Sequence, residues 1–317
     1  MEYAPLVTKA FLVVLVLKEL IESYLASRNK LHIQKNQFEV PEDFKDEISL
    51  DDHKKAAAYS ISKINSSQFF NLFSIIVLLV WTLGGGLNAL NHLVNRFSLS
   101  DLQTSVAFVL LFGLFSFLLS LPQSLYSTFV LEEKYGFNKT DGKTFTADIF
   151  KGLLLSALIG IPLLMALFWI IQKLGEFWWI YAWALFVAFQ FFIMWAYPAF
   201  IAPLFNKFSP LEEGETKKRV EELLERIGFK SKGLFVMDAS KRSAHGNAYF
   251  TGFGENKRIV FFDNLIKTLN PEEIEAVLAH ELGHFKKKHI LKNMIKSIII
   301  TFIGFALLGF FYTWEPF

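Results

Sequence analysis

Ala279-His280-Glu281-Leu282-Gly283-His284-Phe285 is the stretch around which the rest of the chain is organised, because it contains the pattern H-E-x-x-H. Two histidines four residues apart on an α-helix lie one above the other, so both imidazoles can reach one metal ion. Glu281 would stand beside that ion, where its carboxylate can accept a proton from water. The pattern predicts a Zn²⁺ site with His280 and His284 as ligands and Glu281 as the general base.

The residues before the motif specify the start of the helix that would carry it. Asn270 is a good N-cap residue, Pro271 suits the first helical position, and Glu273 stands where a capping-box side chain reaches back to the Asn270 amide. At about 100° per residue, the apolar side chains form one stripe beside the histidines. The stripe consists of Ile274, Val277, Leu278, Leu282 and Phe285. The alternative to a metal site is that two histidines lie exposed near a membrane surface.

The composition indicates a membrane protein. Of the 317 residues, 53% are hydrophobic and 36 are Phe, which is far too apolar for a soluble domain of this size. The chain contains no cysteine, which excludes disulfides and thiolate metal ligands. No basic tract with interleaved aromatic residues indicates nucleic-acid binding, so we expect no nucleic-acid partner. The sequence does not indicate the oligomeric state.

Hydropathy predicts six membrane spans. The first carries an ionisable cluster, Lys18, Glu19 and Glu22, and such a cluster inside a span faces protein or a water-filled cavity rather than lipid. Lys18 and Glu22 are spaced to pair along one helix face. The alternative is that the cluster lies near the end of a tilted helix. The six spans fall near residues 5–26, 69–91, 102–130, 150–172, 177–205 and 293–313.

Proline and glycine residues inside these spans predict irregular helices. Each proline removes a backbone hydrogen bond that neighbouring groups or water must replace, which is compatible with kinked helices around a cavity. These residues are Pro122, Pro162, Pro198 and Pro203, together with the run Gly84-Gly85-Gly86 in the second span.

The distribution of Lys and Arg predicts the orientation in the membrane. The loops after the first, third and fifth spans are rich in basic residues, whereas the alternate loops near 92–101 and 173–176 hold one each. Under the positive-inside rule, the loop 206–292 is cytosolic and the N-terminus lies on the opposite side. We therefore expect a transmembrane domain with five spans over 1–205, a cytosolic metalloprotease domain over 206–292, and the sixth span within 293–317.

The cytosolic segment is predicted to combine helices with strands. Residues 214–228 are typical of an amphipathic helix, 233–237 of a strand, and 248–253 with 258–262 of a hairpin that the metal helix follows directly. An extended peptide can pair with the edge of such a strand while its scissile carbonyl meets the metal. Asn247 and Tyr249 are candidates for these contacts; the alternative is that they shape a turn and pack.

The sixth span begins about ten residues after the motif, so the metal should lie within about 15 Å of the membrane boundary. We therefore expect a membrane-linked substrate.

Several runs resemble one known family, the integral-membrane type I CAAX prenyl endopeptidases, which are zinc metalloproteases. The resemblance covers nearly the whole chain. The runs are Lys55-Ala-Ala-Ala-Tyr59, Glu133-Lys-Tyr-Gly-Phe-Asn138, Pro203-Leu-Phe-Asn-Lys-Phe208, Ser240 to Phe253, Lys257 to Asp263, and the H-E-x-x-H motif itself.

The resemblance implies a mainly α, polytopic membrane fold, with transmembrane helices around a water-filled chamber and a small cytosolic α+β zincin-like domain. It implies peptide-bond cleavage after a prenylated cysteine in eukaryotic members, with one zinc ion per site. It also implies roles for individual residues: zinc ligands His280 and His284, general base Glu281, and the substrate-binding strand residues Asn247, Ala248 and Tyr249.

The sequence departs from the family pattern at its C-terminal end. The family supplies a third zinc ligand, a glutamate on a helix beyond the sixth span. The only acid after Glu281 is Glu315, which the predicted orientation places at the far membrane face. We expect the third ligand to lie beyond Phe317 and the sequence to be truncated at its C-terminus.

No nearby residue is expected to replace the missing ligand. His289 lies five residues after His284, about 180° around a continuous helix from His280. Glu273 shares the histidine face but stands about 10 Å along the helix from it.

Two classes of function follow from the sequence. The first is a membrane zinc endopeptidase that acts on prenylated or membrane-associated peptides. The second is an inactive membrane scaffold that binds peptide or lipid without hydrolysis, which the missing ligand favours. Quality-control proteolysis of membrane proteins is a related enzymatic alternative.

Overall fold

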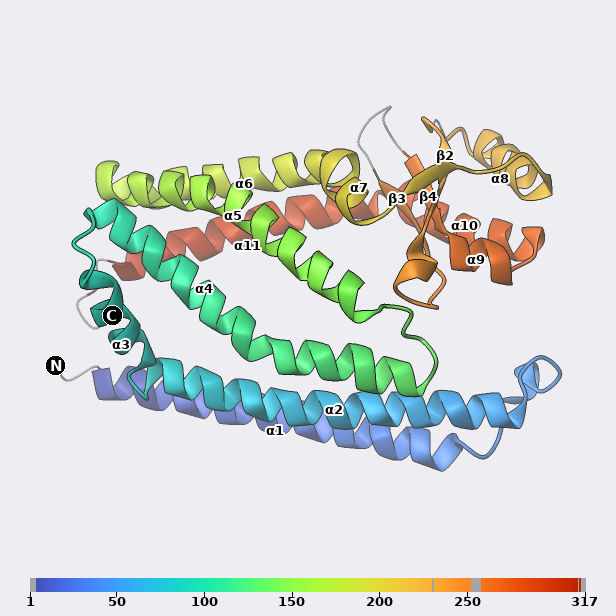
Figure 1. Cartoon of the computed structure of the whole chain (residues 1–317), viewed down its shortest axis with the longest axis horizontal. Helices are drawn as coiled ribbons and strands as arrows, with labels where there is room; N and C mark the ends of the chain where they lie inside the picture. Colours follow the sequence, from blue (N-terminus) through green and yellow to red (C-terminus); the bar gives the residue numbers. More distant parts are fainter. Residues whose placement is uncertain (1–3, 230, 252–257, 313, 315–317) are drawn as a thin grey trace. The chain divides into compact units, whose positions relative to one another are not determined.

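The computed structural model describes residues 4–229, 231–251, 258–312 and 314 (Figure 1). Most of these residues are helical, and the only sheet they form has four strands. Contacts divide the chain into two compact units, one of Met1–Tyr135 with Thr313–Phe317 and one of Gly136–Tyr312. The mainly α fold class is confirmed.

The first unit is built from long helices. α1 and α2 lie side by side along their length (Figure 1). α4 continues into a π-helical turn, Ser127–Glu132. The helices are α1 (Ala4–Asn36), α2 (Leu50–Thr82), α3 (Gly86–Asn95) and α4 (Asp101–Tyr126), with a short 3₁₀ turn at Glu42–Phe44.

A glycine divides the second predicted span. α2 ends at Thr82 and α3 begins at Gly86, so the stretch 69–91 is not one helix. Gly85 between them has φ of 78°, a left-handed conformation that glycine adopts without steric cost. The helical part of the span predicted near 69–91 therefore ends at Thr82, and the glycine run that was expected to loosen the span marks the break.

The ionisable cluster of α1 pairs as predicted. Lys18 Nζ donates to Glu22 Oε2 at 3.0 Å and to Glu19 Oε1 at 2.8 Å. Glu19 Oε2 accepts a hydrogen bond of 2.7 Å from Asn71 Nδ2 of α2, beside a groove of about 790 Å³. Glu19 therefore faces protein, which favours the interior placement of this carboxylate over a position at a helix end.

The second unit joins apolar helices to the sheet. α6 packs along α11 through edge-to-face contacts of Trp179 and Trp183 with Phe302. Pro198 lies in a π-helical turn that follows α6, and Pro203 lies in the short α7, so the predicted irregularity occurs here. The long helices are α5 (Gly142–Lys173), α6 (Trp178–Ala196) and α11 (His289–Tyr312), and the irregular end of α6 comprises the π-helical turn Tyr197–Ile201 and α7 (Ala202–Phe205).

Five helices among the described residues are long and apolar enough to cross a membrane. α1 is not one of them, because Lys18, Glu19 and Glu22 interrupt its apolar stretch, and the span near 5–26 stays a prediction. The water-filled chamber and the division of the chain into three domains also stay predictions. The five helical segments are Leu50–Thr82, Asp101–Glu132, Gly142–Lys173, Gly175–Phe205 and His289–Tyr312.

The sheet has the strand order β1-β2-β4-β3. β2 and β4 run parallel, whereas the β1–β2 and β3–β4 pairs are antiparallel. The predicted strand at 233–237 and both hairpin strands are present, and the hairpin tip at 252–257 lies outside the described residues. The strands are β1 (Phe208–Pro210), β2 (Leu234–Met237), β3 (Ala248–Thr251) and β4 (Arg258–Phe262).

Three helices accompany the sheet. The predicted amphipathic helix is α8 (Glu215–Arg226), and the helix with the histidine motif is α10 (Pro271–Lys286). A short helix, α9 (Asp263–Thr268), separates α10 from β4, so the expectation that the metal helix follows the hairpin directly is wrong. β1 was also not predicted, because three residues containing a proline carry no strand signal.

One face of the sheet packs against α8 and α10 and forms the core that holds the histidine helix. Three members of the predicted stripe, Ile274, Leu278 and Leu282, are buried, and Val277 and Phe285 pack around them. Burying large aliphatic side chains contributes about 1.5–3 kcal/mol each. Their partners include Val220, Leu224, Leu234, Ile259 and Phe261. α10 is thus fixed by its apolar face, and its histidine side stays accessible.

Candidate metal centre and peptide-binding edge

α10 begins with the predicted capping box. Asn270 Oδ1 accepts a hydrogen bond from the Glu273 amide at 2.9 Å, and Glu273 Oε2 accepts one from the Asn270 amide at 2.8 Å. Two amides that lack helical partners are satisfied by these bonds. Local sequence therefore sets where the helix starts, and with it the position of the two histidines farther along the same helix.

The two imidazoles of the motif converge. His280 Nε2 and His284 Nε2 lie 3.3 Å apart, and the ring centroids are 5.0 Å apart. Zn–N bonds of about 2.0–2.1 Å at a tetrahedral ion place two ligand nitrogens roughly 3.3–3.4 Å from each other. Both histidines are exposed and Glu281 between them is half-buried. The nitrogen pair therefore fits a tetrahedral zinc ion, with a carboxylate adjacent.

The described residues supply two nitrogen donors to this centre. Among residues 4–229, 231–251, 258–312 and 314, no group of three or more His, Cys, Asp or Glu side chains is placed to hold a metal ion. The third ligand expected beyond Phe317 stays a prediction.

His289 lies where a continuous helix would not put it. α10 ends at Lys286, Lys288 adopts the left-handed φ of 54°, and α11 begins at His289. The chain therefore turns, and His289 Nδ1 comes within 2.8 Å of His284 Nδ1. The predicted placement of His289 on a continuous helix is therefore wrong. The break was not predictable from the sequence, because Lys286–Lys288 contains neither glycine nor proline.

β3 forms one edge of the sheet and presents main-chain groups there. The Phe262 amide donates to Asn247 O at 2.8 Å, so Asn247 bonds toward β4. In an antiparallel pair this orientation alternates, so the carbonyls of Ala248 and Phe250 point to the open edge. The Ala248 amide donates to Asn247 Oδ1 at 2.8 Å. The Asn247 side chain thus shapes the entry to the strand, and Ala248 offers an acceptor beyond it.

The Tyr249 side chain lies on the sheet face opposite α10. Its hydroxyl contacts Met237 Sδ at 3.9 Å, and its ring packs edge-to-face on Phe262. Burial raises the pKa of Tyr249 to about 12, so the hydroxyl stays protonated at neutral pH. Tyr249 also lines a cavity of about 420 Å³ with Arg258 of β4.

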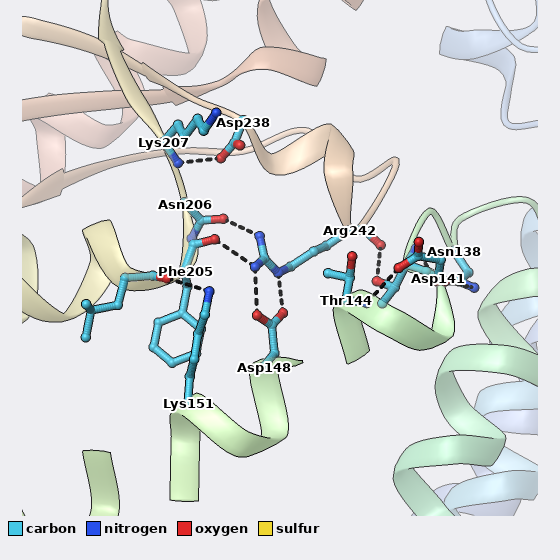
Figure 2. Close-up of polar contacts among 12 residues, drawn as sticks. Asn138, Asp141, Thr144, Asp148, Lys151, Phe205, Asn206, Lys207, Asp238 and Arg242 are labelled. Carbon is cyan, nitrogen blue, oxygen red and sulfur yellow. Dashed lines mark hydrogen bonds and ion pairs between the residues drawn. The ribbon is translucent and has the colours of Figure 1, made fainter. Parts of the chain in front are cut away.

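One arginine anchors the loop that leads into β3, a contact that Figure 2 shows. Arg242 Nε and Nη2 donate to the two carboxylate oxygens of Asp148 on α5 at 2.7 and 2.9 Å. Arg242 Nη1 donates to Asn206 Oδ1 at 2.8 Å, and Nη2 donates to Phe205 O at 2.7 Å. A bidentate arginine–carboxylate pair has a fixed geometry. Arg242 therefore ties the loop before β3 to α5 and to the end of α7.

Backbone bonds hold the same loop from a second side. The Lys139 amide and Thr140 Oγ1 both donate to Arg242 O, at 3.1 and 3.0 Å. The Ala244 amide donates to Phe137 O at 2.9 Å, so residues 137–140 form a short bridge to the loop. Sequence reasoning missed this role of Arg242; the dense polar run from Ser240 to Asn247 is the signal that points to it.

Asp263 anchors the loop from its other end. It accepts hydrogen bonds from the Ser240 amide at 2.8 Å and from Ser240 Oγ. Burial alone would raise the pKa of Asp263, but these bonds and Lys267 outweigh it and lower the pKa. Stability from this contact is present above the unfolded pKa near 4 and is lost as pH falls through the lower folded value.

Arg242→Lys should destabilise the loop even though it retains the charge. Lysine cannot form the bidentate pair and reach Asn206 and Phe205 as well, and each lost bond to a charged group costs about 1.5–3 kcal/mol. We expect a lower Tm and faster proteolysis within 238–247. The matched control is Arg226→Lys, because Arg226 is 64% exposed in its pair with Glu275 and such pairs contribute about 0–1 kcal/mol. Equal Tm values for the two variants would contradict the anchoring role.

The chain matches two family descriptions. Residues 29–207 match "CAAX prenyl protease N-terminal, five membrane helices", and residues 210–315 match "Peptidase family M48". It is 36% identical to the CAAX prenyl protease 1 homolog of Taenia solium, over 96% of this chain and 73% of that protein. It is 40% identical to CAAX prenyl protease 1 of Saccharomyces cerevisiae, over 90% of this chain and 65% of that protein.

The fold is also similar to a solved structure. The crystal structure of S. mikatae Ste24p superposes with a TM-score of 0.88 at 38% identity, covering 94% of this chain and 70% of that chain. The chain thus spans about two thirds to three quarters of the length of these relatives. The sequence motifs, the fold and the comparisons agree, and the chain belongs to the CAAX prenyl protease branch of peptidase family M48, whose members are membrane metalloproteases.

Proposed function

We propose that the protein is a zinc endopeptidase that hydrolyses prenylated, CAAX-type peptides at a membrane. The observation that carries this proposal is the convergence of His280 Nε2 and His284 Nε2 to 3.3 Å beside Glu281. This spacing suits one tetrahedral ion. The names of the related proteins support the substrate class, since they are CAAX prenyl proteases.

His280 and His284 would hold the ion through their Nε2 atoms. A bound zinc ion lowers the pKa of water and polarises a carbonyl oxygen. Glu281 accepts the proton from the attacking water and then delivers it to the leaving amine. Glu281 is half-buried and lies between the two ligands in the motif, so its carboxylate can stand beside the ion that they would hold.

The open edge of β3 is the proposed binding site for the substrate backbone. An extended peptide would pair there by donating an amide hydrogen to the Ala248 carbonyl, and this bond would set the register of the pairing. Asn247 precedes this residue in the chain and Tyr249 follows it. Because main-chain bonds carry this pairing, the strand can bind different peptide sequences. The prenyl group would then supply the selection for membrane-linked substrates.

The proposed metal centre lies close in sequence to a helix that is long and apolar enough to span a membrane. α11, an apolar helix long enough to span a bilayer, begins at His289, five residues after the second ligand. We therefore expect the proposed centre within about 15 Å of the membrane boundary. A peptide with a prenyl chain in the bilayer is concentrated at this height. The excess of basic residues in loop 206–292 supports a cytosolic position for the centre.

A paired-peptide assay tests the proposal. Purified protein in lipid vesicles is given a farnesylated peptide and the same peptide without the farnesyl group, each with a quenched fluorophore. We expect zinc-dependent cleavage of the farnesylated peptide and at least tenfold slower cleavage of the other. Binding of the farnesylated peptide without cleavage would instead support the scaffold alternative, and equal cleavage of both would favour quality-control proteolysis.

N-methylation of the substrate should reveal the strand pairing. Methylating the amide that donates to the Ala248 carbonyl removes one hydrogen bond and introduces a clash at the edge, so kcat/KM should fall about tenfold or more. Methylating the adjacent amide, which points away from β3 in an extended chain, is the matched control and should have a much smaller effect. A series of N-methylated peptides provides the measurement. A fall in kcat/KM that does not alternate along the peptide would contradict pairing with β3.

A further inference from the structure

We propose that His289 is a positioning residue that holds the ring of His284 and accepts the Nδ1 hydrogen of the tautomer that binds metal. The inference rests on the proposed zinc site. The carrying observation is the 2.8 Å separation between His284 Nδ1 and His289 Nδ1, on the side of the His284 ring away from the Nε2 atom that approaches His280.

The hydrogen-bond chemistry of two neutral imidazoles explains this role. A neutral imidazole has one N–H donor and one acceptor nitrogen, so one of the two facing Nδ1 atoms must carry the hydrogen. If His284 Nδ1 carries it and donates to His289 Nδ1, then His284 Nε2 keeps its lone pair for the metal. The reverse assignment puts the hydrogen on His284 Nε2 and blocks metal binding. Metal binding at Nε2 therefore requires the assignment in which His284 Nδ1 donates, and His289 Nδ1 is placed to accept that hydrogen.

Metal-bound histidines generally donate their second ring N–H to a carboxylate, a carbonyl or water, and this partner fixes the ring orientation. Here the partner is an imidazole nitrogen. The two rings stand 4.9 Å apart at an interplanar angle of 70°, so the contact runs through the ring edges and leaves the other edge of His284 open toward His280.

The backbone places His289 for this role. The Lys287 amide donates to Gly283 O at 3.0 Å and the Lys288 amide donates to Phe285 O at 2.8 Å, which closes the end of α10. Lys288 then takes the left-handed conformation with φ of 54°, which is uncommon for a residue other than glycine. This turn directs the first residue of α11 back against His284. Membrane helix α11 therefore contributes its first side chain to the support of the metal ligand.

Zinc affinity of the purified protein tests the role of His289. His289→Leu removes the acceptor and keeps an apolar side chain, whereas the amide oxygen of His289→Asn can accept from His284 Nδ1. Loss of such a partner typically lowers metal affinity 10- to 100-fold. We expect this loss for His289→Leu, and an affinity for His289→Asn within about threefold of the unmodified protein. Competition with a chromogenic chelator gives the affinities without requiring catalysis.

Two comparisons make the result decisive. His92→Leu, a histidine substitution on α3 in the other unit, should leave zinc affinity unchanged. Equal weakening by His289→Leu and His289→Asn would mean that packing matters and the hydrogen bond does not, which overturns the inference. Unchanged affinity in His289→Leu would overturn it as well. If the unmodified protein binds no zinc, the proposed metal site fails first, and the role of His289 fails with it.

Discussion

Glu281→Gln is expected to lower kcat on a farnesylated peptide by about 10²- to 10⁴-fold while the bound zinc stays in place. The amide has nearly the same shape as the carboxylate, so the packing of this half-buried side chain is kept, but it cannot accept a proton from water. Because Glu281 is not one of the two nitrogen ligands, zinc content should not change. Steady-state kinetics and elemental analysis of the same preparation provide the measurements.

The matched control for this variant is Glu275→Gln on the same helix. Glu275 forms ion pairs with Arg219 and Arg226 and lies away from the histidines, so kcat should stay within about twofold. If Glu281→Gln retains activity within tenfold of the unmodified protein, another group must act as the base.

His280→Ala is expected to reduce activity to the level without enzyme and to abolish stoichiometric zinc binding. Alanine removes one of two nitrogens placed 3.3 Å apart, and the remaining imidazole alone does not define a tetrahedral site. Removing zinc from the unmodified protein with a chelator should have the same effect, and adding zinc back should restore activity. Restoration should fail in the variant. Peptidase assays before and after chelation make this comparison.

An unchanged fold of the His280→Ala variant is the control that separates loss of a metal ligand from loss of structure. Because Ile274, Leu278 and Leu282 hold α10 by its opposite face, His280→Ala should keep the circular dichroism and Tm of the metal-free protein. Full zinc-dependent activity in His280→Ala would show that the metal lies elsewhere.

Local signals explain why the sequence predicted the histidine helix so well. The capping box of Asn270 and Glu273 and the apolar stripe each depend on residues within a few positions of one another, and both are present in the structure. The convergence of His280 and His284 follows from their spacing on a regular helix. The histidine motif could therefore be placed without tertiary information.

Features that depend on distant contacts were not predictable in the same way. The parallel pairing of β2 with β4 and the bonds of Arg242 to Asp148 join segments far apart in the chain. No local pattern specifies them. The turn at Lys288 is local, but it lacks glycine, so its position became visible only in the structure and with it the contact between His284 and His289.

Zinc content per chain is the most direct test of the central claim that His280 and His284 form a metal centre. Elemental analysis of purified protein equilibrated with zinc and freed of excess metal, alongside His280→Ala, gives the result without any substrate. The account predicts close to one zinc per chain in the unmodified protein and little or none in the variant. Little zinc in both proteins, or equal zinc in both, would contradict it.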